Sequence, residues 1–465
     1  MRVCIYRSYV PVLSRYGEGA WLAGQAERIV SPVKAPLVRF TLMGWLVLIP
    51  LLLMPLSARA YSVLSHEEVV DQAWLPYLVP LIQQRYPGLT ADQIRECHAY
   101  AYGGSVIQDI GYYPFGDKEF SDLLHYVRSG DFVAALLRDA KTPDEFAFAL
   151  GALAHYYGDT VGHPVVNIIT GEEYPKLRSR FGRIVTYGDN ETAHLRTEFG
   201  FDVVEVAHGA YSQQNYRDFI GFQVAKDVLA RAFLETYGLP IDDVLTHEDL
   251  AISTYRYSIS TLIPKMTKVA LAGYGQQIQH ANPSFAKDQF IYRLRRTEFE
   301  QEYGRQRTHA TFGERFVAFL LAIIPKIGPF SALRLHLPDG DQQTQFLASF
   351  DDVENAYRVQ IKQVAAAPAS APPTPPELDF DTGQPTAEGE YKLADASYAW
   401  LVERIAGDDK AQMPPALLAD LNHFYSDPQA KDAVKAKPGD WTHLQIALTK
   451  VRSVPATPKT AVTLP

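Results

Sequence analysis

The sequence predicts an all-α protein, and three observations support that fold class. Apolar residues recur at three- and four-residue spacing from Tyr61 to about Val364, while alternating β-branched runs are few. Helix-start signals, in which a capping residue is followed by an acidic or amide side chain, recur along the same stretch. The chain has 465 residues, 47% of them apolar, which is enough for several packed helices.

The helix-start signals place the elements in order. A helix should open at Ser65 and run toward Gln84, and the next should open at Thr90. Thr142 supplies an N-cap before Pro143 at the first helical position, which predicts a long apolar helix. Further helices are expected over five ranges: 191–207, 216–237, 247–272, 287–303 and 345–364.

Composition divides the chain after its first sixty residues into four parts. Residues 61–240 should form one helical domain, with 241–364 as a helical extension packed on it. Residues 365–390 are rich in Pro and Ala, which predicts an extended, semi-rigid linker. Residues 391–465 contain enough apolar side chains for a small helical module with a flexible tail, to which the sequence assigns no task.

The first sixty residues have the pattern of a secretory signal peptide. Lys34 and Arg39 precede the apolar run 42–56, and small residues ending at Ala60 follow it. That run is shorter than the ~20 residues needed to span a bilayer. We therefore expect cleavage after Ala60 and a secreted or periplasmic protein, with a retained anchor as the alternative.

The length of this segment and the charge of the remainder have further consequences. Sixty residues is long for a signal, so a translation start near Val33 or Val38, with 1–32 as a start-site artefact, is an alternative. Removing residues 1–60 changes the net charge from −9 to −14, which argues against a broad nucleic-acid footprint. Only Cys97 then remains, so the exported form has no internal disulfide.

One apolar segment outside the signal raises the question of membrane contact. Residues 316–324 lie between Arg315 and Lys326 and are too few to cross a membrane. A buried core helix ended by Pro325 is the favoured interpretation, and peripheral docking on a membrane is the alternative.

The strongest chemical signal is the spacing His155-x3-Asp159-x3-His163 within the helix expected after Thr142. Positions i, i+4 and i+8 lie on one face of a helix. The two histidines are then about 12 Å apart along the axis, whereas two ligands of one zinc lie at most about 4 Å apart. The spacing therefore predicts two metal ions, with Asp159 available to either. Because Pro164 disfavours helical geometry in the residue before it, a helix break is expected at His163.

Other acidic and histidine side chains are weaker candidates. His194 and Glu198 repeat the i, i+4 spacing on another expected helix, although such a pair is more often a solvated surface pair. Asp109 could bind a metal or simply cap the turn before Gly111. His125 could be a ligand or a core histidine. Their number within one predicted domain favours a shared metal site.

His66 lies five residues after the predicted new N-terminus at Tyr61. A free α-amine forms a five-membered chelate with its own carbonyl, and its pKa of ~7.7–8.0 lets a metal displace the proton easily. The remaining histidines lack partners at ligand spacing, and we expect them to be structural or surface residues.

Taken in order, these residues resemble the zinc-dependent phospholipase C family, an all-α fold with three zinc ions that single-strand-specific zinc nucleases also share. The resemblance spans residues 61 to about 200 and makes 61–240 the catalytic domain. Tyr61 stands where the secreted bacterial enzymes begin with Trp. The four-residue step from Asp159 to His163 replaces their six and looks more like glycosylphosphatidylinositol-specific phospholipase D.

The resemblance implies ligands for each of three zinc ions. The first would be held by four side chains: Asp109, His125, His155 and Asp159. The second would share the bridging carboxylate of Asp159 and add the amine and carbonyl of Tyr61 and the side chain of His66. The third would be held by three side chains: His163, His194 and Glu198.

The implied activity is an exported, phospholipase C-like hydrolysis of a phospholipid or related phosphodiester. Two close zinc ions lower the pKa of a bound water toward ~7 and neutralise charge on phosphorus, and Asp109 could accept the proton. A nuclease or nucleotidase of the same fold is the enzymatic alternative, which Glu198 in place of Asp and the negative charge disfavour. A non-catalytic, zinc-stabilised binding protein is the other alternative.

Overall fold

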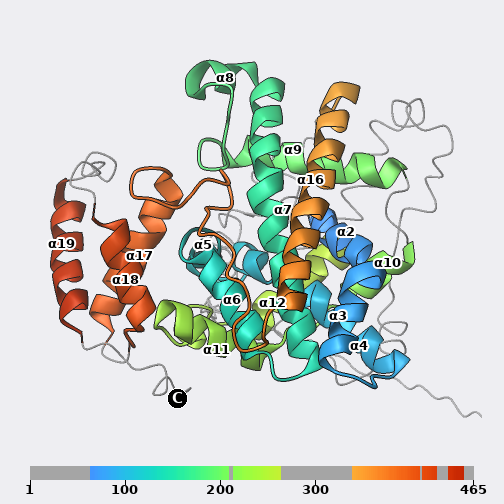
Figure 1. Cartoon of the computed structure of the whole chain (residues 1–465). Coiled ribbons are helices and arrows are strands. Elements are labelled where there is room, and N and C mark those ends of the chain that lie inside the picture. The colour runs from blue at the N-terminus through green and yellow to red at the C-terminus, as the bar shows by residue number, and fades with distance from the viewer. Residues whose placement is uncertain (1–62, 209–212, 263–337, 409–410, 427–437, 455–465) are drawn as a thin grey trace, which may run out of the picture. The chain divides into compact units, whose positions relative to one another are not determined.

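The computed structural model describes residues 63–208, 213–262, 338–408, 411–426 and 438–454 (Figure 1). Within these ranges the regular elements are helices, without a β-strand, and a single bridge joins Leu378 to Pro385. The all-α prediction is confirmed. None of the helices in these ranges combines the length and apolar character needed to cross a membrane.

The N-terminal helices follow the predicted starts. α2 (Val63–Ala73) continues through the π-helical turn η1 (Trp74–Leu78) into α3 (Val79–Arg85). α4 (Ala91–Gly104) begins with the expected capping box, in which the side chain of Thr90 accepts a hydrogen bond from the third helical residue. The capping signals therefore predict these starts to within about two residues.

Three shorter elements precede the central helix. They are the 3-10 turn η2 (Ile107–Tyr112), α5 (Lys118–Tyr126) and α6 (Ser129–Asp139). η2 and α5 are held together where the backbone N–H of Gly111 donates to the Ser121 hydroxyl at 2.9 Å. Gly111 has no room for a side chain there, because a Cβ would lie 2.3 Å from the Asp117 carbonyl oxygen.

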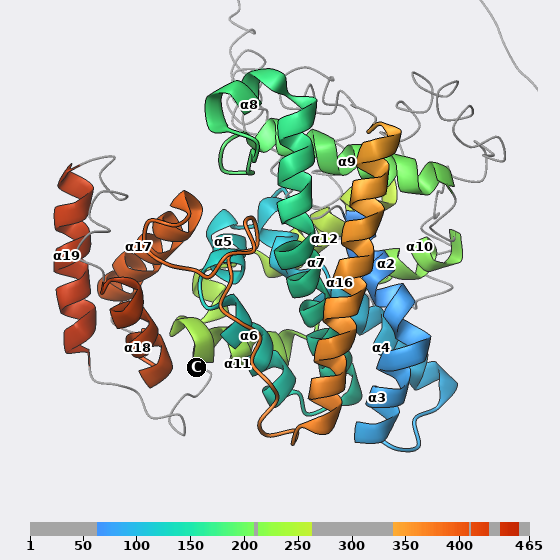
Figure 2. The same cartoon turned by 45° about the horizontal axis from the view of Figure 1, so that its top comes forward.

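The central helix α7 (Pro143–Glu173) is 31 residues long and is capped as predicted by Thr142, whose hydroxyl accepts from the Glu145 N–H at 3.1 Å. It packs against α4 and against α16 (Gly340–Ala366), which runs beside it in both orientations (Figures 1 and 2). α7 thus presents one face to α4 and another to α16.

The helix break expected at His163 is wrong, because α7 continues through Pro164. A proline inside a helix costs about 3 kcal/mol, since it removes one hydrogen bond and crowds the carbonyl four residues earlier. Here that carbonyl, of Thr160, lies against Gly383, where a Cβ would approach it to 2.3 Å. The extensive burial of α7 offsets the local cost of the proline.

The helix expected over 216–237 is two helices, α10 (Gln213–Ile220) and α11 (Lys226–Tyr237). Between them the chain crosses α4, where the Gln223 N–H donates to the Ala99 carbonyl at 2.8 Å. A Cβ at Gly103 would lie 1.6 Å from the Gln223 carbonyl oxygen, so the crossing depends on that glycine. The contact with α4 interrupts the expected helix. The spacing of apolar residues gives no sign of this contact, because its partners are far apart in the sequence.

The remaining helices are two short ones that the sequence did not predict, α8 (Pro175–Phe181) and η3 (Ile241–Asp243), and expected helices whose ends are shifted. α8 and α9 (Glu191–His208) follow α7, and η3, α12 (Glu248–Tyr257) and η4 (Ser258–Leu262) follow α11. The expected helix 287–303 and the apolar segment 316–324 lie outside the described residues, as does 263–272. α16 starts earlier than expected, because Asp339 caps it in a box with Gln342.

The Pro/Ala-rich segment differs from the extended linker that its composition predicts. Its backbone is irregular, but residues 375–384, which we call the strap, lie against α5, α6 and α7. Phe380 and Asp381 are buried at 0% and 2% exposure. The prolines disfavour a helix in this segment. They do not prevent its burial, because Phe380 is apolar and the side chain of Asp381 is hydrogen-bonded.

The C-terminal helices are α17 (Lys392–Gly407), α18 (Pro415–Phe424) and α19 (Pro438–Ser453). Tyr398 and Phe424 stack between α17 and α18 with ring centroids 3.6 Å apart. α17 also packs on α5, and α18 on α11. These helices therefore share contacts with the body from which the linker was expected to separate them.

Glu377 attaches the strap to the start of α6 and gives a pH-dependent prediction. Its carboxylate accepts hydrogen bonds from the backbone N–H groups of Asp131 at 2.8 Å and Gly130 at 3.1 Å. Burial, reinforced by the negative charge of Asp131, raises the pKa of Glu377 to about 8. Because this value lies above that of the unfolded chain, the contribution to stability is present below pH ~4.5 and is lost as pH rises through 8.

Glu377→Gln, which cannot ionise, should therefore change the pH profile of stability. We expect the melting temperature of the variant to be below that of the wild type at pH 5, because one acceptor is lost, and to approach or exceed it at pH 9. Thermal unfolding of both proteins from pH 5 to 9, both zinc-saturated, measures the difference. A difference independent of pH would show that Glu377 stays ionised in the folded protein.

Candidate metal centre

Eight of the nine candidate ligands converge in one buried cluster, which we call the metal cluster. Each of its members is at most 4% exposed: His66, Asp109, His125, His155, Asp159, His163, His194 and Glu198. They come from α2, η2, α5, α7 and α9. The ninth candidate, Tyr61, lies outside the described residues.

Within the metal cluster, three groups of side chains offer ligand atoms within 4.8 Å of one another. The groups have these members: His66, His155 and Asp159; Asp109, His125 and His155; His163, His194 and Glu198. None of the three contains both His155 and His163, in keeping with their i, i+8 spacing on the unbroken α7. The same separation was predicted from helix geometry alone.

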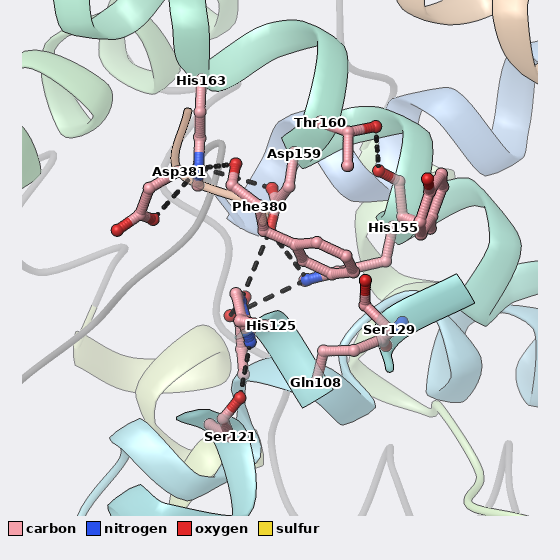
Figure 3. Close-up of polar contacts among 12 residues, drawn as sticks. Gln108, Ser121, His125, Ser129, His155, Asp159, Thr160, His163, Phe380 and Asp381 are labelled. Carbon is pink, nitrogen blue, oxygen red and sulfur yellow. Dashed lines mark hydrogen bonds and ion pairs between the residues drawn. The ribbon is translucent and has the colours of Figure 1, made fainter. Parts of the chain in front are cut away.

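Asp159 lies between the groups, and its two carboxylate oxygens face different histidines (Figure 3). Oδ2 is 3.0 Å from His155 Nε2 and 3.4 Å from His125 Nε2. Oδ1 is 3.3 Å from His66 Nε2 and 3.4 Å from His163 Nε2. The carboxylate is therefore positioned to contribute one oxygen to each of two neighbouring ions.

The third group is built on the i, i+4 pair of α9. Glu198 Oε1 lies 2.7 Å from His194 Nε2 and 3.3 Å from His163 Nε2. The rings of His163 and His194 meet edge to face, with centroids 5.3 Å apart. Both ends of the pair are buried, so the solvated-surface interpretation of His194 and Glu198 does not apply.

Backbone carbonyls fix the orientation of three histidines. Each of these rings donates its Nδ1–H to a main-chain oxygen: His125 to Ser121 at 2.8 Å, His155 to Ser105 at 2.9 Å, and His163 to Phe380 at 3.0 Å. A carbonyl oxygen can only accept, so Nδ1 carries a proton and Nε2 is the nitrogen left to bind a metal in the metal cluster. This is the arrangement that metal-binding histidines commonly adopt.

The donor set fits zinc. Among the described residues, both carboxylate oxygens of Asp109 and the Nε2 atoms of His125, His155, His163 and His194 form no well-aligned hydrogen bond, although nitrogen and oxygen atoms of the metal cluster lie close together. Leaving such buried atoms unpaired is costly. The short separations between neighbouring nitrogen and oxygen atoms, mostly 3.0–3.4 Å, match the ~3.3 Å between two ligands of one tetrahedral zinc.

The electrostatics of the metal cluster favour ionised carboxylates. Burial alone would raise the pKa of Asp159, but the neighbouring histidines, His163 foremost, hold it well below its usual range. Burial likewise opposes charge on His125, yet Asp109 and Asp159 raise its pKa to about 9. Burial and the nearby His155 lower the pKa of His66. The negative charge of these buried carboxylates thus favours the binding of cations in the metal cluster.

Comparison with protein families accounts for this arrangement. Residues 65–246 match the family described as zinc dependent phospholipase C. This part of the chain belongs to that family. Comparison with curated proteins and with solved structures found no match. All eight residues of the metal cluster lie within the matched segment, whereas the strap and the helices after it lie outside it.

The strap supplies the contacts that sequence reasoning missed. Phe380 lies over His125 and His155 with ring centroids 4.9 and 5.9 Å apart, and Asp381 Oδ1 is 3.6 Å from His163 Nδ1. More than 200 residues separate these partners in the sequence, so spacing carries no signal for them. The two acids that flank Phe380 in a Pro-rich segment were the only local indication.

The geometry of the third group predicts that His194→Ala and Glu198→Ala behave alike. Each should lose one zinc ion and keep two, because both side chains serve the same position. Metal analysis of the purified, folded variants measures this, with Glu191→Ala at the start of the same helix as the control. Retention of three ions in either variant would contradict the third site.

Proposed function

We propose that this protein is an exported, zinc-dependent phosphoric diester hydrolase that acts on a phospholipid or a related phosphodiester. The observation that carries the proposal is the position of Asp159, whose two oxygens face separate pairs of histidines inside the family-matched segment. A buried site of this kind suits substrates whose reaction concentrates negative charge on phosphorus.

The side chains of this chain would divide the work as follows. When bound, the ions would supply Lewis acidity toward a phosphoryl oxygen and a nucleophilic water at neutral pH. Asp109, whose two oxygens have no hydrogen-bond partner among the described residues, is available to take up a proton. Phe380 packs on the buried rings of His125 and His155 and limits the access of bulk water to them.

Export and cleavage after Ala60 remain part of the proposal. His66 lies in the metal cluster close to the start of α2, as a ligand near a newly formed N-terminus should. If the Tyr61 amine binds zinc, an uncleaved chain presents an amide there, which has no basic lone pair. The precursor would then be inactive.

A one-residue extension tests the N-terminal ligand. Protein that begins Met-Tyr61 moves the amine by about 3.8 Å, beyond the tolerance of a ~2 Å zinc bond. We expect it to bind less zinc and to hydrolyse phosphodiesters at least ~10-fold more slowly than protein beginning at Tyr61. Mass spectrometry confirms both termini. Equal zinc content and equal rates would remove Tyr61 from the ligand set.

The activity itself is tested on three substrates with zinc-loaded protein. Zinc content is measured alongside hydrolysis of phosphatidylcholine, a nitrophenyl phosphodiester and single-stranded DNA. We expect diacylglycerol release from phosphatidylcholine or cleavage of the nitrophenyl ester, and a large loss of either in Asp109→Asn. Preferred cleavage of DNA would instead support the nuclease alternative. Three bound zinc ions without hydrolysis would support a zinc-stabilised binding protein.

Peripheral contact with a membrane also remains a proposal. The apolar segment on which it rests, residues 316–324, lies outside the described residues. Sedimentation with phosphatidylcholine vesicles, in the presence and absence of zinc, measures whether the whole protein binds a lipid surface. This binding is measured separately from lipid hydrolysis.

A further inference from the structure

The strap brings a buried carboxylate to the back of a candidate metal ligand. The Nδ1 of His163 faces the strap, 3.0 Å from the Phe380 carbonyl and 3.6 Å from Asp381 Oδ1 (Figure 3). The Nε2 of the same ring faces Glu198 and Asp159 at 3.3 and 3.4 Å. His163 therefore connects the metal cluster on one side with the strap on the other.

Asp381 is held in this orientation by the hydroxyls of two tyrosines. Tyr126 donates to Oδ2 at 3.0 Å, and Tyr391 donates to the same oxygen. Both hydroxyls bind Oδ2, which leaves Oδ1 as the oxygen nearer His163. Tyr126 belongs to α5 and Tyr391 directly precedes α17, so the carboxylate is fixed from two elements.

The backbone of the strap is fixed to the same region. Asn167, one turn beyond His163 on α7, donates its side-chain N–H to the Asp381 carbonyl at 2.6 Å. The Phe380 N–H donates to the His125 carbonyl at 3.2 Å. Two adjacent strap residues therefore contact elements that carry ligands of two different groups in the metal cluster.

Burying a carboxylate at 2% exposure is unfavourable unless positive charge faces it. A zinc-bound imidazole supplies that charge, because the metal draws electron density from the ring and strengthens the Nδ1–H as a donor. A carboxylate behind a metal-binding histidine in turn orients the ring and raises its basicity. The Phe380 carbonyl accepts the Nδ1–H at 3.0 Å and already fixes the ring, so Asp381, 3.6 Å from Nδ1, acts through its negative charge. That electrostatic effect requires a charged group at the position of Asp381.

We propose that Asp381 is a positioning residue for the third metal ion, acting through His163, and that the strap completes a metal centre whose ligands all lie in the family-matched segment. The inference rests on the proposed zinc centre and extends it to a part of the chain outside the family match. Asp381 does not touch the ion, so its loss should weaken the third site without abolishing it.

Asp381→Asn tests the proposal, because it keeps the shape and removes the charge. We expect the variant to hold the third zinc ion 10- to 100-fold more weakly in competition with a chromophoric chelator, with the other two affinities unchanged. In cobalt-substituted protein, the absorption assigned to the third site by comparison with His194→Ala should shift. Unchanged affinity and spectrum would overturn the proposal.

The matched control is Asp420→Asn in α18. Asp420 also accepts a hydrogen bond from a tyrosine, Tyr398 at 3.0 Å, and has no described contact with the metal cluster. Its variant should keep all three affinities, and an equal loss in both variants would reduce the role of Asp381 to general stability. If Asp381→Asn does not fold, Tyr126→Phe, which removes one hydroxyl from the carboxylate, should show a smaller loss at the same site.

The measurement separates this inference from the proposed function. Zinc affinity does not depend on turnover, so a protein that binds three ions without hydrolysing any substrate still tests Asp381. A wild type that binds no zinc would defeat both statements. Three tight sites that are indifferent to Asp381→Asn would defeat the inference alone.

Discussion

Asp159→Asn should remove more than one zinc ion and lower phosphodiester hydrolysis by about 1,000-fold or more. The carboxylate presents Oδ2 to His125 and His155 and Oδ1 to His66 and His163. An asparagine keeps one weakly basic oxygen and replaces the other by an N–H₂ group, which cannot bind a cation. Two positions therefore lose a ligand at once, and the paired ions on which the chemistry depends are separated.

Metal analysis and steady-state kinetics on the same preparation measure both effects. Asp144→Asn, which changes an aspartate in the first turn of the same helix, is the control and should keep three ions. A folded Asp159→Asn protein that loses one ion or none would show that the carboxylate serves a single site. Circular dichroism verifies that α7 persists, since the comparison is meaningful only for folded protein.

Helix positions were predictable where the signal is local. The N-caps Thr90 and Thr142 fix their helix starts through hydrogen bonds within three residues, and both are found as predicted. The same is true of the i, i+4 spacings on α7 and α9, which place ligand candidates on one face of each helix. Local sequence signals were therefore enough to predict the fold class and to select most of the residues of the metal cluster.

Features decided by distant contacts were not predictable in this way. Pro164 should end α7 on local grounds, yet the helix continues because its length is buried by α4 and α16. The break between α10 and α11 depends on the approach of Gln223 to Gly103. In both cases a tertiary contact overrides what the local sequence favours.

The strap shows the same limit at the site. Its Pro/Ala composition predicts an extended linker, whereas the segment is buried against α5, α6 and α7. Phe380 is buried, and Asp381 contacts His163, because the strap packs on helices that precede it in the sequence by more than 200 residues. Spacing rules identify ligands that share a helix and cannot identify a residue that orients a ligand from another part of the chain.

Removing zinc should lower the melting temperature by about 15 °C or more. A ligand present at 100 times its dissociation constant stabilises the folded state by about 2.7 kcal/mol, and three such ions together contribute about 8 kcal/mol. At about 2 °C or more per kcal/mol for a body of this size, the shift follows. The ions are also needed electrostatically, because Asp109, Asp159 and Glu198 are buried together.

The loss of stability should be local before it is global. Chelation releases the ligand faces of α5, α7 and α9, and through His163 it also weakens the attachment of the strap. We therefore expect hydrogen exchange to accelerate in residues 120–127 and 375–384, while the Tyr398–Phe424 stack between α17 and α18 keeps its protection. Zinc should restore both the melting temperature and the exchange pattern, and magnesium, which prefers six oxygen ligands, should not. A melting temperature that does not change after verified removal of zinc would mean that protons alone balance the buried carboxylates, and that the metal cluster folds without its ions.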